Sequence, residues 1–140
     1  MRDVHSVLDT MYDVLVPIDR DVERTRNQVE YVLSLPGTDE IEATVLHVTP
    51  REESTSGERA FDDVDAAVEA AERLEEGGIT VDRAVDIGTV TKKITEYAND
   101  IDAAEIVLGG RKRSGVAKVL VGSVAQDVLY SSDRPVVITG

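Results

Sequence analysis

Short apolar runs alternate along the chain with longer segments in which apolar residues recur every three or four positions. The short runs, bounded by charged residues, predict buried strands, whereas the spacing of three and four predicts helices with one buried face. The runs predict strands at residues 12–19, 43–48, 79–85, 104–109 and 135–139. The spacing predicts helices at residues 22–35, 61–76, 89–99 and 122–132.

This alternation predicts an α/β fold built on a single five-stranded parallel, doubly wound sheet with helices on both faces. The 140 residues fit one domain. We expect that domain to span residues 12–140 after an N-terminal extension at 1–11, with loops at 49–60 and 110–118. Ligands of such folds bind beyond the carboxyl ends of the strands, so the turns from strand to helix are the first place to search.

The charge of the chain narrows the choice of partners. Asp and Glu number 28 against 15 Lys and Arg, which gives a net charge of −13. A negative field of this size repels nucleic acid and anionic lipid, so we expect neither nucleic acid nor a membrane as a partner. An acid excess with scarce lysine resembles proteins of salt-loving archaea and bacteria, in which salt screens the self-repulsion. An acidic protein from an ordinary environment is the alternative.

Residue types that are absent exclude several chemistries. The chain has no cysteine and only two histidines, His5 and His47, so thiolate metal sites, cysteine nucleophiles and histidine zinc sites are excluded. No apolar run approaches the ~20 residues of a membrane helix. No basic segment followed by an apolar one opens the chain, and we expect a cytoplasmic protein.

Positive charge gathers just before the last predicted helix. Four of the 15 cations lie within eight residues: Arg111, Lys112, Arg113 and Lys118. Ser123 and Gln126 form a plausible capping box at the helix start that follows. Cations beside the free N–H groups of a helix start favour a phosphate site. A solvated loop whose cations pair with nearby carboxylates is the alternative.

The same region resembles the universal stress protein family. Nucleotide-binding members of that family carry a glycine, two residues, a second glycine, nine residues and then Gly-Ser or Gly-Thr. Here Gly109 stands first and Gly122-Ser123 last with the spacing kept, whereas Lys112 occupies the position of the second glycine. Residues 16–19 and 45–48 are similar to the ends of the family's first two strands, and the resemblance covers residues 12–139.

The resemblance implies a Rossmann-like, adenine nucleotide α-hydrolase-like fold that binds ATP or another adenine nucleotide. It implies that Asp19 contacts the adenine and that Val48 lines the base pocket. Lys112 leaves two alternatives open: it blocks the phosphate position, at a backbone cost if φ is positive there, or its ammonium group reaches the phosphates. The candidate binding residues are Pro17, Ile18, Asp19, Val48, Leu108, Gly109, Arg111, Lys112, Gly122, Ser123 and Val124.

Several of these residues have a purely structural alternative. Asp19 could instead cap the helix that begins at Val22. His47, among apolar neighbours, is more typical of a hydrogen-bonded core or interface histidine than of a catalytic one. Three carboxylates at the start of the second predicted helix favour a role in its first turn over a metal site. They are Asp62, Asp63 and Asp65.

Three functions remain open from the sequence. The first is a stress-response module that reversibly binds an adenine nucleotide or another phosphate-bearing ligand. The second is a dimeric interaction protein of the same fold with no nucleotide bound. Its last strand, Pro135–Thr139, is apolar on both faces, and the resemblance implies antiparallel pairing of this strand in a homodimer. The third is an enzyme that uses ATP, but the loops pair no base with a nucleophile, so we assign no catalytic or metal residue and expect weak ATP hydrolysis at most.

Overall fold

A computed structural model describes residues 11–53, 60–112 and 119–140 of the chain. The predicted extension at residues 1–11 therefore lies almost wholly outside the described residues. The same holds for much of the predicted loop at 49–60 and for two members of the cationic cluster, Arg113 and Lys118.

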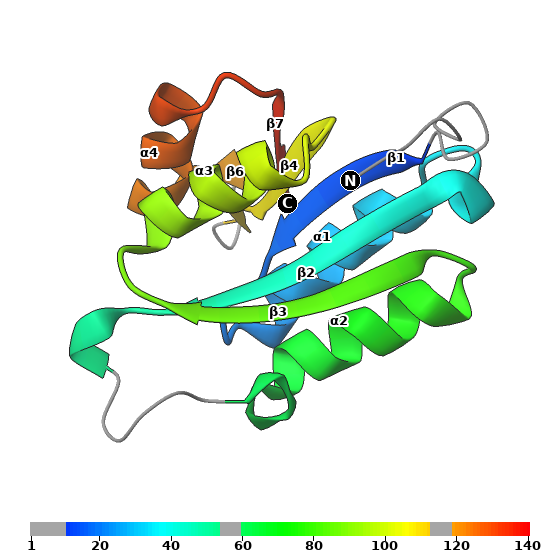
Figure 1. The fold of residues 1–140 in the computed structure, drawn as a ribbon, viewed down its shortest axis with the longest axis horizontal. Helices are drawn as coiled ribbons and strands as arrows, with labels where there is room; N and C mark the ends of the chain where they lie inside the picture. The colour runs from blue at the N-terminus through cyan, green and yellow to red at the C-terminus, as the bar shows by residue number, and fades with distance from the viewer. Residues whose placement is uncertain (1–10, 54–59, 113–118) are drawn as a thin grey trace.

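Five parallel strands form one sheet in the order β3-β2-β1-β4-β7 (Figure 1). This confirms the predicted α/β fold, and it places the strand predicted at 79–85 on the edge of the sheet. Strand β1 lies in the middle of the sheet. Strands β2 and β3 follow on one side of it, and β4 and β7 lie on the other side. The strands are β1 (Tyr12–Pro17), β2 (Ile41–Thr49), β3 (Thr80–Ile87), β4 (Glu105–Gly109) and β7 (Val136–Thr139).

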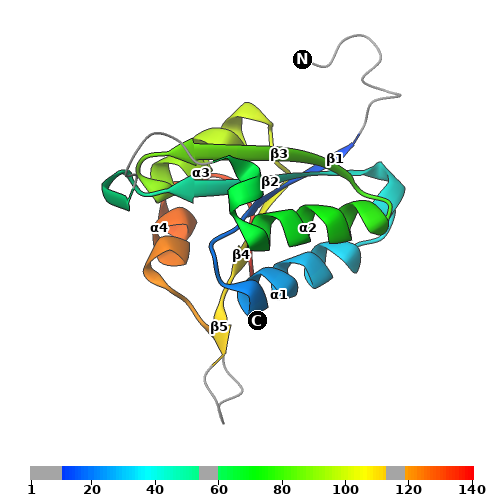
Figure 2. The same cartoon turned by 90° about the horizontal axis from the view of Figure 1, so that it is seen from below.

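Four α-helices of the described ranges cover the two faces of the sheet. Helices α1 and α2 lie side by side on one face, and α3 and α4 pack on the other (Figure 2). The helices are α1 (Val22–Leu33), α2 (Asp65–Glu76), α3 (Val90–Asp100) and α4 (Ser123–Ser131). Short 3-10 turns occupy the connections: η2 (Thr38–Glu40), η3 (Arg51–Glu53) and η4 (Phe61–Asp63).

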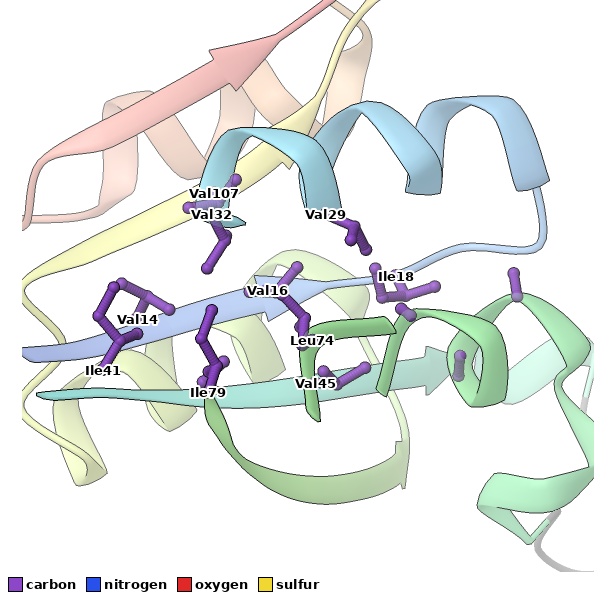
Figure 3. Packing of buried hydrophobic residues seen from close by; sticks show 14 of the residues in the cluster. Val14, Val16, Ile18, Val29, Val32, Ile41, Val45, Leu74, Ile79 and Val107 are labelled. Carbon is purple, nitrogen blue, oxygen red and sulfur yellow. The ribbon is translucent and has the colours of Figure 1, made fainter. Parts of the chain in front are cut away.

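Two buried clusters hold these layers together, because successive side chains of a strand point to opposite faces. On the α1 and α2 face, Val16 and Val45 of the strands meet Val32 and Leu74 of the helices, all at 0% exposure (Figure 3). On the other face Leu15 packs in a cluster with residues of α3 and α4. Helices therefore pack on both faces of the sheet, and this packing holds the carboxyl ends of the strands in defined positions.

The helix predicted at residues 61–76 is interrupted. The Asp63 side chain accepts a hydrogen bond from the Ala60 N–H at 3.1 Å and closes η4 as a separate turn. Val64 then adopts an extended backbone, with φ −111° and ψ 98°, so that α2 begins at Asp65. The apolar spacing predicted the buried face correctly, but it carries no sign of this break.

The segment predicted as a loop at 110–118 begins with a strand. Strand β5 (Arg111–Lys112) pairs antiparallel with β6 (Val119–Leu120) in a separate two-stranded ladder. Figure 2 shows β5 continuing beyond the end of β4, away from the body of the domain. The cationic cluster thus starts in a strand rather than in a loop that runs to the last helix.

Candidate functional site

A cavity of about 610 Å³ lies at the carboxyl ends of β1, β2 and β4, between the first turns of α1 and α4. Its volume falls in the range of small-molecule sites, ~300–1,000 Å³. The position also fits the general rule for doubly wound sheets, because β1 and β4 are the neighbours between which the strand order reverses.

The fold brings most of the predicted binding residues to this cavity. Arg111 and Lys112 are the two exceptions: they lie in β5, and only the backbone there is described. That these residues bind a ligand stays a prediction. The nine that line the cavity are Pro17, Ile18, Asp19, Val48, Leu108, Gly109, Gly122, Ser123 and Val124.

One part of the cavity wall is apolar. Three buried core residues at the ends of neighbouring strands form this part: Ile18, Val48 and Leu108. Each is at most 8% exposed. Ile94 of α3 adds to the same wall. A flat apolar group, such as a purine or another aromatic ring, fits a wall of this chemistry.

His47 supports this wall. It is 5% exposed, and its Nδ1 lies 2.8 Å from the carbonyl oxygen of Ile18. The contact holds the chain just after β1 against β2. The interpretation of His47 as a hydrogen-bonded core histidine is therefore confirmed, although the sequence did not indicate that it also lines the cavity.

The opposite part of the wall is a helix start. Gly122, with φ −75° and ψ 174°, is the N-cap of α4, and within the described residues no side chain caps this helix. The predicted capping box is wrong, since Ser123 is the first helical residue and not the cap. The first N–H groups of α4 and the positive end of its dipole thus face the cavity without a capping carboxylate or hydroxyl.

Space remains open around this helix start. A Cβ built on Gly122 would meet no atom within 4 Å, and Ser123 and Val124 are exposed. A ligand can therefore approach the backbone here closely, and an anionic group is the chemistry that a helix N terminus favours.

Asp19 is not the cap of α1. That role belongs to Asp21, whose Oδ1 accepts a hydrogen bond from the Arg24 N–H at 2.8 Å. Asp19 Oδ1 accepts from the Asp21 N–H at 2.9 Å, and its other oxygen pairs with the Arg24 guanidinium. Asp19 therefore stands at the cavity as a second carboxylate beside the cap.

Arg24 and Gln28 of α1 line the cavity as well, and the sequence analysis did not indicate either of them as a site residue. Gln28 is 1% exposed, and its Nε2 donates to the carbonyl oxygens of Pro17 at 2.7 Å and Val107 at 2.9 Å. It joins the carboxyl ends of β1 and β4. A polar residue beside Val29 on the buried face of a helix was the signal that could have indicated it.

The backbone at Lys112 answers one of the questions that the sequence left open. Lys112 pairs with Val119 in the β5–β6 ladder, so its backbone is extended rather than left-handed. A lysine therefore meets no conformational penalty at the position where the family motif has a glycine.

Metal binding and membrane insertion find no support in the described ranges. Among residues 11–53, 60–112 and 119–140, no three histidine or carboxylate side chains gather as a metal site would require. Asp63, one of the three carboxylates considered, instead accepts from the Ala60 N–H. Across the same ranges no helix has the length and apolar character needed to cross a bilayer.

Comparison with known proteins gives a family match and several structural matches. The model described as "Universal stress protein family" matches residues 11–140. A universal stress protein from Archaeoglobus fulgidus superposes with a TM-score of 0.70 and 24% identity, over 91% of this chain and 98% of that one. No curated protein sequence matches the chain.

Two of the similar structures were solved with nucleotides. The universal stress protein from Archaeoglobus fulgidus in complex with dAMP has a TM-score of 0.69 and 21% identity, over 91% of this chain and 97% of that one. A universal stress protein in complex with cAMP has a TM-score of 0.66 and 17% identity, over 92% and 96%. At these identities the likeness to each structure establishes the shared fold.

Proposed function

The chain belongs to the universal stress protein family, and from that premise we propose that it binds an adenine nucleotide reversibly in the cavity at the carboxyl ends of its strands. Its sheet and four flanking helices have the adenine nucleotide α-hydrolase-like fold of that family. The observation that carries the proposal is the cavity itself, which joins an apolar wall to an uncapped helix start.

The two walls suit the two halves of a nucleotide. The base lies against Ile18 and Val48, near the Asp19 carboxylate, and the phosphates lie at the start of α4 beside Gly122 and Ser123. Fixed N–H groups and the helix dipole stabilise the phosphate charge there. Relatives solved with dAMP and cAMP support an adenine nucleotide as the ligand class. ATP is the member of that class that we propose for this chain.

Lys112 joins the phosphate end in this proposal. Its extended backbone removes the conformational argument against a lysine, and a local cation offsets the −13 net charge of the chain for an anionic ligand. The ammonium group would act as a point charge on the phosphates. In this proposal the protein is a stress-response module that binds its ligand reversibly.

Isothermal titration calorimetry with ATP, ADP and AMP tests the proposal at one fixed, high salt concentration. Replacing Ser123 by Ala should weaken binding by about 1–3 kcal/mol, because the hydroxyl makes a charge-assisted hydrogen bond to phosphate. Ser131→Ala is the matched control: its hydroxyl donates to the Asp127 carbonyl oxygen at the far end of the same helix. Absence of binding of all three nucleotides at millimolar concentration would contradict the proposal.

Lys112→Gly decides the role of the lysine in the same titration. We expect weaker binding with a flatter salt dependence, since a phosphate contact is lost. Tighter binding would instead show that the lysine blocks the phosphate position.

A second candidate function is assembly through β7. Among the described residues, this strand forms an edge of the five-stranded sheet and pairs with β4 alone. Its open side is a template for pairing with another strand. We propose an antiparallel β7 pair in a homodimer, which is compatible with nucleotide binding because β7 does not line the cavity.

A further inference from the structure

Arg24 is a cation of the cavity wall whose side chain is mostly buried. It lies in the first turn of α1, its side chain is 18% exposed, and its guanidinium pairs with Asp19 through Nη1 and with Asp21 through Nη2 at 3.4 Å. By contrast Arg26, two residues along the same helix, is 56% exposed and pairs with Glu69 of α2. The two arginines thus face different surroundings, and only Arg24 contributes to the site.

The stem of Arg24 covers the end of β4. A Cβ built on Gly109 would overlap Arg24 Cγ and lie 2.6 Å from Arg24 Cδ. Gly109 has no left-handed φ, so its backbone would accept any residue. The glycine is therefore needed here because the arginine methylenes occupy the space above it. A ligand that reaches Gly109 on this side has to displace Arg24.

The charges around Arg24 determine which ligands can displace its side chain. Asp19 and Asp21 stand side by side at the rim, and Arg24 contacts both of them. A neutral ligand that displaces the guanidinium breaks these contacts and offers no replacement. A phosphate offers the guanidinium a new, bidentate partner, and the cation at the same time reduces the repulsion between the phosphate and the two carboxylates.

We propose that Arg24 is the specificity-determining residue of this cavity, and that it restricts the site to ligands with an anionic group, nucleotides rather than nucleosides. This inference rests on the proposed nucleotide function. Arg20 lies at the same rim, but it is exposed, whereas the Arg24 stem is packed on Gly109.

The test compares AMP with adenosine. Dissociation constants for both ligands are measured by calorimetry on the wild type, on Arg24→Ala and on Arg26→Ala, which removes the same charge from the same helix outside the cavity. Arg24→Ala opens space for both ligands but removes the cation that favours AMP. The preference for AMP over adenosine should fall at least about tenfold, the equivalent of about 1.4 kcal/mol. Arg26→Ala should keep the wild-type preference.

The outcomes separate this inference from the proposed function. An unchanged preference in Arg24→Ala, with AMP still bound, overturns the role of Arg24 and leaves nucleotide binding in place. Failure of the wild type to bind either ligand overturns the proposed function and the selectivity with it.

A double-mutant cycle of melting temperatures, with Gly109→Ala and Arg24→Ala, tests the position of Arg24 without any ligand. Gly109→Ala should lower the melting temperature by several degrees when Arg24 is present, because the new methyl group overlaps its stem. In the Arg24→Ala background the same substitution should cost clearly less, with only the 3.2 Å contact to Gln28 Oε1 remaining. Equal losses in the two backgrounds would show that Arg24 does not lie over Gly109, and would overturn the inference.

Discussion

Gln28 is the residue on which the geometry of the cavity depends most directly. Its buried amide donates to the carbonyl oxygens of Pro17 and Val107, and so fixes the distance between the ends of β1 and β4. Gln28→Leu keeps a similar volume but loses both hydrogen bonds. We expect the free energy of unfolding to fall by about 1–3 kcal/mol, measured by urea denaturation.

Gln126→Leu is the control for this substitution, because Gln126 is exposed on α4. Surface changes of this kind stay within about 0.5 kcal/mol. A loss no larger in Gln28→Leu than in Gln126→Leu would contradict the proposed role of Gln28.

A second buried polar group lies at the amino end of the sheet. Glu105 is 5% exposed and accepts hydrogen bonds from the hydroxyl groups of Tyr12 and Tyr31, the latter at 2.7 Å. The hydrogen bond to Glu105, with burial, raises the pKa of Tyr12 from 10.0 to about 12. Burial, with the hydrogen bond to Glu105, raises the pKa of Tyr31 from 10.0 to about 12.

These pKa values predict a loss of stability in base. A tyrosine whose pKa is raised by folding stabilises the fold fully below the unfolded pKa, near 10, and loses that contribution as the pH rises through about 12. The titration of each tyrosine ring can be followed by NMR. Glu105→Gln should lower both pKa values, that of Tyr12 more, because burial is the larger cause at Tyr31.

Exposed Glu76 supplies the matched control, since Glu76→Gln removes the same charge from a carboxylate other than the one to which both hydroxyls donate. Tyrosine pKa values that are equal in Glu105→Gln and Glu76→Gln would contradict this account of the cluster.

Single residues also show where prediction from the sequence stops. Asp19 and Asp21 are both plausible caps two positions apart, and only the backbone geometry before α1 selects Asp21. In the same way Ser123 has the chemistry of a cap, but Gly122 has the extended backbone of one. In both cases the residue type located the helix start to within two residues. Which residue is the cap depends on backbone dihedral angles, which cannot be read from the sequence.

At the scale of elements, periodicity was a good guide to the fold and a poor guide to the connections. Buried strands such as β1 and β4 are short apolar runs, so their existence could be predicted. The break between η4 and α2 depends on one side chain, that of Asp63. The β5–β6 ladder consists of two residue pairs. Features of this size are set by local hydrogen bonds and leave no period in the sequence.

The prediction at the scale of elements concerns the pairing of β7 in a homodimer. Val137→Lys places a charge on the open edge strand, and it should convert a homodimer into monomers because a charged edge resists pairing. Light scattering at tens of micromolar protein measures the change. Val22→Lys, at an exposed valine where α1 begins, should leave the dimer intact. A wild-type protein that is already monomeric would refute assembly through β7.

For the whole molecule, the net charge of −13 predicts a fold that depends on salt. Repulsion among the carboxylates opposes compaction when screening is weak, and the Debye length shortens from ~30 Å at 0.01 M salt to ~3 Å at 1 M. The melting temperature should therefore rise between about 0.05 M and about 3 M KCl, a range over which screening becomes complete. A flat melting temperature across this range would remove the interpretation of the acidic composition as an adaptation to salt.

The central claim is that an adenine nucleotide binds at the carboxyl ends of the strands. The most direct test is an NMR titration of the wild-type protein with ATP, with backbone amide shifts assigned along the chain. The account predicts saturable shifts at Asp19, Val48 and the first turn of α4, residues that line one cavity, while α2, which contributes no residue to the lining, stays unchanged. Absence of shifts at millimolar ATP, or shifts confined to elements away from the cavity, would contradict it.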